Sequence, residues 1–154
     1  MFLDEKSEKK KIEVVASNAQ DRELPIIHEN AGLEEIVKEM IRFGHSRILY
    51  VADDARRLLG TISLGNLTRT VFSTSYEPRI HPRRLMTAIT MEKAGHMMQK
   101  HLVFARMEET IITVVRRMIK ANVKELAILD EENRIIGDIT MLDLLEYILE
   151  QKKP

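Results

Sequence analysis

The sequence is 154 residues long, enough for one domain of ordinary size or for two small repeats that share a core. Hydrophobic residues make up 44% of it, which predicts a packed interior and argues against global disorder. Its 24 basic and 24 acidic residues cancel, which argues against nucleic acid as the main partner, and the lack of cysteine excludes disulfides and thiol chemistry. No apolar run approaches the ~20 residues of a membrane helix. We therefore expect no membrane partner and, given the lack of cysteine, a cytoplasmic location.

The first half of the chain predicts one repeat after a polar start. Residues 1–11 alternate acidic residues and lysines, so we expect a flexible N-terminus and no secretory signal. The first repeat is expected over residues 12–73. Within it, apolar residues at helical spacing predict an amphipathic helix over 33–41. Around that helix we expect a short helix, three strands and a final helix, at residues 12–20, 24–27, 48–51, 58–63 and 64–72.

The second half returns to the same order of elements after an interruption. Residues 74–95 hold prolines, arginines and a histidine, which predict an irregular basic connector. The second repeat is expected over residues 96–151. Its predicted elements are strand, helix, strand, strand and helix, at residues 102–105, 111–119, 126–129, 134–139 and 140–151.

The two halves match each other along their length. The apolar positions of the two amphipathic helices correspond at an offset of 78 (111 − 33). A second set corresponds at an offset of 77 (137 − 60), which relates Gly60, Ser63 and Asn66 to Gly137, Thr140 and Asp143. We expect the slip of one residue in the turn between the last two strands, where an insertion is tolerated. The period predicts two α+β units that bury their apolar faces on one another.

The strand-to-helix junctions of the two halves resemble the CBS motif, named after cystathionine β-synthase. The motif is an apolar strand that ends in Asp, followed by Gly-x-x-Ser/Thr-x-x-Asp. In the second half it is similar to Ala127-Ile128-Leu129-Asp130 and Gly137-Asp138-Ile139-Thr140-Met141-Leu142-Asp143. In the first half it is similar to Leu49-Tyr50-Val51-Ala52-Asp53 and Gly60-Thr61-Ile62-Ser63-Leu64-Gly65-Asn66. The resemblance covers about residues 12–151 and implies a tandem CBS pair, or Bateman module, in which two α+β repeats are related by a pseudo-two-fold axis.

The resemblance also implies a regulatory role. A CBS pair would bind an adenine nucleoside or nucleotide, such as AMP, ADP, ATP or S-adenosylmethionine, in a cleft between the repeats and pass a conformational change to an effector protein. It makes Asp143 the acceptor for the ribose hydroxyls and places Thr140 near the phosphate. The chemistry agrees, because a carboxylate can accept from two vicinal hydroxyls and a helix start favours an anion. Alternatively, Thr140 and Asp143 only cap the last helix.

The other candidate residues are less complete. Asn66 replaces the Asp of the motif, so the first-repeat site, with Ser63, is expected to be weaker or empty. Arg47 could meet a phosphate or be a solvated charge. An offset of 78 aligns Glu125 of the second repeat with Arg47 of the first. A glutamate repels phosphate, so Lys124 would have to be the phosphate-binding cation of the second repeat. In the family the first short strand of each repeat lines the adenine slot, here 25–27 and Val103 to Ala105, although any of these can be a plain core residue.

Catalysis and metal binding find little support in the sequence. It contains no Ser/His/Asp order, Gly-rich phosphate loop or HExxH motif, so we expect a non-enzyme without a prosthetic group. His96 and His101 do not have the spacing of a helical metal-ligand pair.

We expect a homodimer. Asn66 and Glu125 favour a second hypothesis, a ligand-free dimerisation or interaction module. A third, a nucleic-acid-binding CBS protein that uses Arg83 and Arg84, is disfavoured by the zero net charge.

Overall fold

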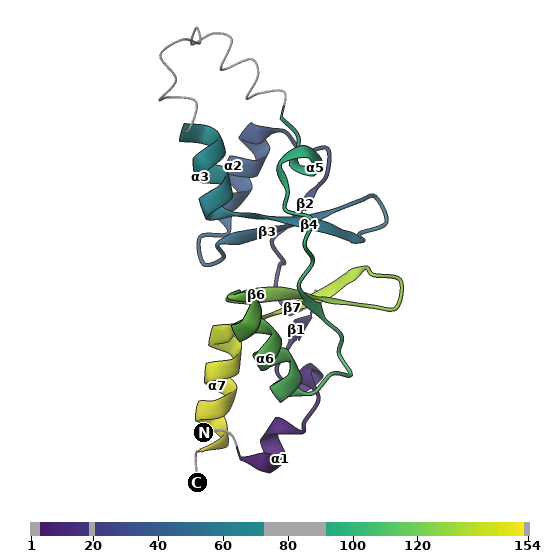
Figure 1. Ribbon diagram of the computed structural model, residues 1–154, viewed down its shortest axis with the longest axis vertical. Coiled ribbons are helices and arrows are strands. Elements are labelled where there is room, and N and C mark those ends of the chain that lie inside the picture. Colours follow the sequence, from purple (N-terminus) through teal and green to yellow (C-terminus); the bar gives the residue numbers. More distant parts are fainter. Residues whose placement is uncertain (1–3, 19–20, 73–91, 153–154) are drawn as a thin grey trace, which may run out of the picture. The chain divides into compact units, whose positions relative to one another are not determined.

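The computed structural model describes residues 4–18, 21–72 and 92–152 and contains two units of mixed helices and strands (Figure 1). One unit, here called the terminal unit, is formed by Met1–Leu24 together with Val103–Pro154, and the other, the mid-chain unit, by Pro25–Leu102. The terminal unit is therefore built from both ends of the chain. The α+β class and the repeated order of elements are confirmed.

The mid-chain unit has a three-stranded sheet in the order β2-β3-β4. Strand β2 (Ile26–His28) runs parallel to β3 (Ile48–Ala52), and helix α2 (Leu33–Arg42) connects the two. Strand β4 (Leu58–Ser63) pairs antiparallel with β3 and leads directly into α3 (Leu64–Phe72), and the short helix α5 (Ala94–Met97) contacts β4 and β2. The periodic residues of α2 form part of the core: Leu33, Ile36 and Met40 are buried with Leu49, Val51 and Ile62.

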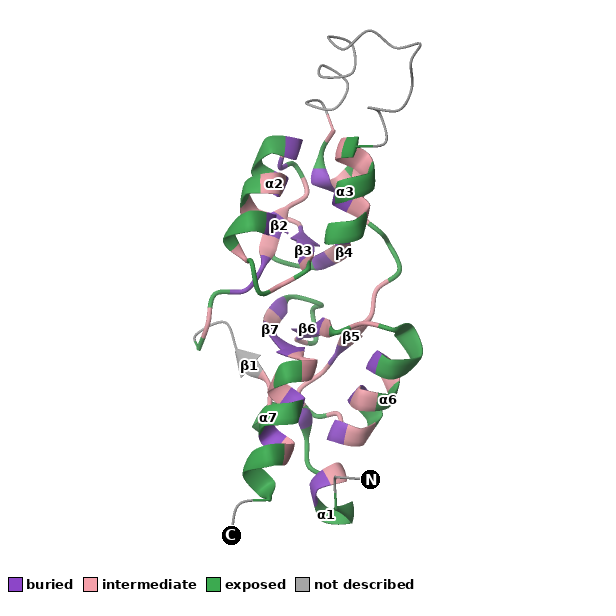
Figure 2. Ribbon diagram, turned by 90° about the vertical axis from the view of Figure 1, so that its left-hand side faces the viewer, coloured by how far each residue is buried: buried purple, intermediate pink, exposed green. Residues whose placement is uncertain are grey.

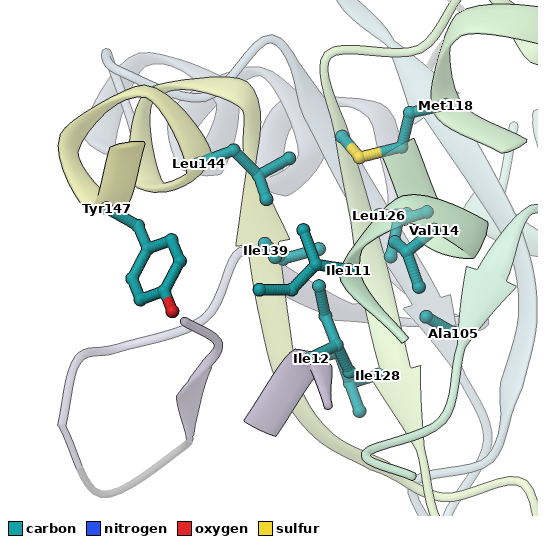
Figure 3. Packing of buried hydrophobic residues seen from close by; sticks show 10 residues of the cluster. All are labelled: Ile12, Ala105, Ile111, Val114, Met118, Leu126, Ile128, Ile139, Leu144 and Tyr147. Carbon is teal, nitrogen blue, oxygen red and sulfur yellow. The ribbon is translucent and has the colours of Figure 1, made fainter. Parts of the chain in front are cut away.

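The terminal unit repeats this plan and adds one strand, giving the sheet order β1-β7-β6-β5. Strand β5 (Phe104–Ala105) is parallel to β6 (Glu125–Leu129), with α6 (Ile111–Ala121) between them in sequence. Strand β7 (Ile135–Thr140) is antiparallel to β6 and leads into α7 (Met141–Gln151), and β1 (Ser17–Asn18) pairs with the free side of β7. Figure 3 shows the core, which includes Ile12, Ile111, Met118, Ile128 and Ile139.

Residues 4–11 are structured where a flexible start was expected. Asp4 caps the single-turn helix α1 (Glu5–Glu8) by accepting from the Ser7 N–H at 2.7 Å, and Ser7 is buried. The chain then pairs with a segment far along the sequence, since the Ile12 N–H donates to the carbonyl of Glu109, 97 positions away (109 − 12), at 2.7 Å. The 3-10 turn η1 (Ile12–Val14) places Ile12, with no exposed surface, in the core. One apolar side chain thus anchors this polar segment.

The backbone pairing corrects the alignment of the two repeats. Ile48 lies opposite Ser63 on β4, and Glu125 lies opposite Thr140 on β7, so Glu125 corresponds to Ile48 at an offset of 77 (125 − 48). Hydrogen bonds to the next helix agree, because the first N–H of α3 donates to the Arg47 carbonyl and that of α7 to the Lys124 carbonyl, both at 2.8 Å. Lys124, and not Glu125, is therefore the counterpart of Arg47.

The slip of one residue lies between the first helix and the following strand, and its predicted place in the hairpin turn is wrong. The two hairpin turns are equivalent. Asp53 accepts hydrogen bonds from the backbone N–H and the side chain of Arg57, and Asp130 accepts the same two from Arg134. The residue before each arginine, Arg56 or Asn133, has a left-handed φ of 66° or 65°. The helix ends differ, since Asn122 ends α6 in the left-handed conformation whereas Phe43 ends α2 without it.

Burial follows the sheets and the helix sides that face them (Figure 2). No helix in the described ranges is long and apolar enough to cross a membrane.

Candidate functional site

Thr140 and Asp143 form a capping box at the start of α7. The Thr140 Oγ1 accepts from the Asp143 N–H at 3.1 Å, and the Asp143 Oδ2 accepts from the Thr140 N–H at 2.9 Å. Each side chain satisfies a backbone donor that the helix itself leaves unpaired, which stabilises the helix start by about 1 kcal/mol. The capping role foreseen as an alternative is therefore present in the structure.

Arg22 joins this helix start to strand β7. Its guanidinium donates to the Asp143 Oδ1 at 3.1 Å and Oδ2 at 2.9 Å, and to the Asp138 Oδ1 through Nη2 at 2.6 Å and Nε at 3.1 Å. The side chain of Asp138 is only 4% exposed and that of Asp143 is 15% exposed, whereas that of Arg22 is 36% exposed. One arginine thus bridges two largely buried carboxylates.

The electrostatics of this cluster follow from burial and pairing. Burial raises the pKa of Asp138, and the hydrogen bonds and charge of Arg22 only partly offset that effect. Burial also opposes the charge on Arg22, but hydrogen bonds to Asp143 and Asp138 outweigh it and raise the pKa of the guanidinium. Arg22 therefore remains a cation throughout the physiological range and holds the two carboxylates together.

The first repeat has a related but uncharged arrangement. The Ser63 Oγ accepts from the Asn66 N–H at 3.1 Å, as Thr140 does in the second repeat. The Asn66 Oδ1 accepts from Arg69 at 2.5 Å and from Gln99 at 3.3 Å. Gln99 is held beside β4 by backbone hydrogen bonds with Thr61 in both directions, at 2.8 and 3.0 Å. In both repeats, protein donors already contact the side chain predicted to bind ribose.

The predicted cations lie next to these helix starts. The Arg47 and Lys124 side chains are exposed, and their backbone carbonyls accept the first N–H of α3 and α7. Both residues therefore lie beside a helix start, and contact of their side chains with a phosphate stays a prediction. Val103, predicted to line an adenine slot, is half-buried and packs against the apolar core of the terminal unit. Its contact with an adenine ring stays a prediction.

Sequence reasoning missed Arg22 and left Asp138 without a partner. Arg22 lies in the polar stretch Asp21-Arg22-Glu23, which has no periodicity, and its partners are 116 and 121 residues away in the sequence. One signal was available, because Asp138 interrupts an otherwise apolar strand and a buried carboxylate requires a cation or donors. Within the described residues, no group of three or more His, Asp or Glu could hold a metal ion.

Comparison with known proteins places this geometry in a family. No curated protein matches the sequence. Among solved structures, CBSX2 in complex with AMP is similar with a TM-score of 0.75 and 15% identity over 93% of this chain and 98% of that one. The CBS domain pair of MJ0100 in complex with 5'-methylthioadenosine and S-adenosyl-L-methionine gives 0.68 and 17% over 93% and 98%. A CBS domain-containing protein from Thermotoga maritima gives 0.72 and 21% over 95% and 99%. These likenesses show the fold.

The family model of the CBS domain matches the sequence twice, at residues 16–73 and 94–150. The two matches cover most of the chain and coincide with the two sets of repeated elements. The chain therefore belongs to the CBS domain family and carries the domain as a tandem pair.

Proposed function

We propose that this protein is a regulatory module that binds an adenine nucleoside or nucleotide at the start of α7. The observation that carries the proposal is that Thr140 and Asp143 form the start of α7 and that Lys124 adjoins it through its backbone carbonyl. Such a terminus favours an anionic phosphate, and a carboxylate can accept from the two hydroxyls of a ribose. The complexes of CBSX2 with AMP and of MJ0100 with 5'-methylthioadenosine and S-adenosyl-L-methionine support this class of ligand.

The first-repeat position, at Ser63, Asn66 and Arg47, would be the weaker of the two. An amide offers a neutral carbonyl in place of a carboxylate, so its hydrogen bonds to hydroxyls are weaker. Binding would act on a partner by favouring one conformation of the pair, and the shift is limited by the difference in affinity of the ligand for the two conformations. The effector would be another protein, and we propose no catalytic role.

A thermal-shift screen with AMP, ADP, ATP and S-adenosylmethionine tests the proposal. A ligand at about 100 times its Kd adds roughly 2.7 kcal/mol to the free energy of unfolding, which corresponds to several degrees in Tm. We expect Asp143→Ala to abolish the ligand-induced shift, because it removes the ribose acceptor. This variant also loses half of the capping box, which can change its Tm without ligand. The quantity to compare between variant and wild type is therefore the change in Tm that the ligand causes.

Asn66→Ala is the matched control for that experiment. It changes the equivalent position of the first repeat and should preserve the larger part of the shift. If none of the four compounds raises the Tm of the wild-type protein, the proposed function is wrong. If Asp143→Ala keeps the full shift, the ligand binds elsewhere.

A ligand-free dimerisation or interaction module is the second candidate. Two observations favour it: Asp143 and Asn66 are already hydrogen-bonded to arginines, and the helices leave large apolar side chains exposed. Glu125 no longer supports it, because Glu125 corresponds to Ile48 and not to Arg47. The third hypothesis depends on Arg83 and Arg84, which lie outside the described residues, so nucleic-acid binding stays a prediction that the balanced charge disfavours.

A further inference from the structure

The hydrogen bonds of Asp143 leave little room for a ribose. A carboxylate has about four lone-pair positions. Oδ2 accepts from the Thr140 N–H and from Arg22 Nη2, and Oδ1 accepts from Arg22 Nη1. About one position is therefore left, whereas two vicinal hydroxyls need two. A ribose can be held by Asp143 only if at least one hydrogen bond from Arg22 is broken.

We propose that Arg22 is an internal competitor for the ribose position, so that ligand binding at Asp143 requires the guanidinium to leave this carboxylate. The inference rests on the proposed function, because it concerns the same site. It adds a residue that sets affinity and that belongs to the N-terminal part of the terminal unit, four positions beyond the end of β1. Ligand would thereby be coupled to the segment that contributes a strand to the sheet.

Asp138 determines how far Arg22 can move. Its side chain is 4% exposed and receives two hydrogen bonds from Arg22, so removing the cation would leave a buried carboxylate without a charge partner. Nη1 donates only to Asp143 and Nε only to Asp138, whereas Nη2 donates to both carboxylates. The guanidinium can therefore release Asp143 while Nε and Nη2 stay on Asp138. Full release of Asp143 therefore breaks two hydrogen bonds and keeps the Asp138 ion pair.

This geometry suggests two variants that separate the roles of Arg22. In Arg22→Lys the ammonium can neutralise Asp138 but lacks the planar fork that bridges both carboxylates, so Asp143 should become available. The double variant Arg22→Gln with Asp138→Asn removes the competing cation together with the buried charge that needs it. Arg134→Lys is the matched control, because Arg134 pairs with Asp130 in the hairpin of the same unit and lies outside the proposed site.

Isothermal titration calorimetry of the full chain with AMP, at fixed salt, provides the test. Circular dichroism melting first establishes that each variant folds. We expect Arg22→Lys and the double variant to bind AMP about tenfold more tightly than the wild type, since hydrogen bonds to a charged carboxylate no longer have to be broken. Arg134→Lys should bind like the wild type. Binding to the two Arg22 variants with none detectable to the wild type would support the inference as well.

The contrary outcomes distinguish this inference from the function on which it rests. Equal affinity of wild type and both Arg22 variants would overturn the competitor role and leave the proposed function in place. Weaker binding by both variants would also overturn it, and would assign Arg22 to the ligand's own contacts. If AMP bound neither to the wild type nor to either Arg22 variant, both the inference and AMP binding at Asp143 would be wrong.

Discussion

Asp138 is a buried carboxylate on a central strand, and its protonation is linked to folding. Burial raises its pKa above the ordinary aspartate value, so the folded state binds this proton more tightly than the unfolded state. The contribution of Asp138 to stability is therefore most favourable below the ordinary aspartate pKa. It decreases as pH rises through the interval between that value and the raised one. Arg22 limits the decrease by pairing with the ionised form.

Removing Arg22 should make the stability strongly dependent on pH. We expect Arg22→Gln to lower the free energy of unfolding by about 1–3 kcal/mol at pH 7. This is no more than the smallest cost usually found when a fully buried ion pair is broken, because the side chain of Arg22 is 36% exposed. The loss should be smaller at pH 5, where more of Asp138 is protonated in the variant. Urea unfolding at the two pH values measures both numbers. Adding Asp138→Asn should remove the difference between them, and an equal loss at both pH values would contradict the account.

The residues of the site differ in how far sequence alone can reveal them. Thr140 and Asp143 were predictable because capping is local, between positions three apart at a strand-to-helix junction. Lys124 was named, but Glu125 was aligned with Arg47 because the position of the one-residue slip is not visible without strand pairing. Arg22 could not be predicted, since its contacts with β7 and α7 depend on tertiary structure that brings residues more than a hundred positions apart together.

The same division between local and long-range signals holds for the elements. Helix α2 was expected over 33–41 and spans Leu33–Arg42, and β4 was expected over 58–63 and spans Leu58–Ser63. Most of the periodic apolar residues of both elements are buried or half-buried in the structure, although Ile41 of α2 is 74% exposed. The two-residue strand β1 has no such pattern and exists because its backbone pairs with Gly137 and Asp138 on β7. Pairing of this kind leaves no trace in the local sequence.

Gly60 of the CBS-like motif has a structural role in β4 that can be tested. A Cβ added there would lie 2.5 Å from the Gln99 carbonyl oxygen and 2.7 Å from the Met98 sulfur, where Thr61 and Gln99 pair. Gly60→Ala should therefore push residues 98–99 away from β4 and lower the free energy of unfolding by about 1–3 kcal/mol in urea titrations. Gly44→Ala is the control, because its Cβ would meet only the Ile41 carbonyl at an ordinary 3.5 Å. If both changes lowered the free energy of unfolding equally, the close contact of Gly60 with residues 98–99 would not be what requires glycine there.

At the scale of the whole molecule, the helices carry apolar residues on surfaces that face away from their cores. In α7, Leu144 and Tyr147 are buried, whereas Leu142, Leu145 and Leu149 are 60–69% exposed. Figure 2 shows that α7 has both buried and exposed residues. Corresponding positions of both repeats share the property: Ile41 and Ile119 are 74% and 67% exposed, and Phe72 and Leu149 are 57% and 66% exposed. Within the mid-chain unit, Ile41 and Phe72 line the same apolar pocket, and apolar surface gathered in this way is typical of a protein interface.

These exposed faces offer a surface for the homodimer that the sequence led us to expect. In the mid-chain unit, residues of α2 and α3 line an apolar pocket of about 200 Å³, which a side chain of a second copy could fill. We expect sedimentation velocity to show a dimer for the wild type at micromolar concentration, and a monomer for Leu145→Glu, because a buried carboxylate without a partner opposes association. Glu146→Gln, at the exposed neighbouring position on α7, should remain dimeric. Because Leu145 is 60% exposed within the single chain, the monomeric variant should keep the wild-type circular dichroism spectrum. A wild-type protein that sediments as a monomer over the whole concentration range would contradict the prediction, and these leucines would then be open to a different partner.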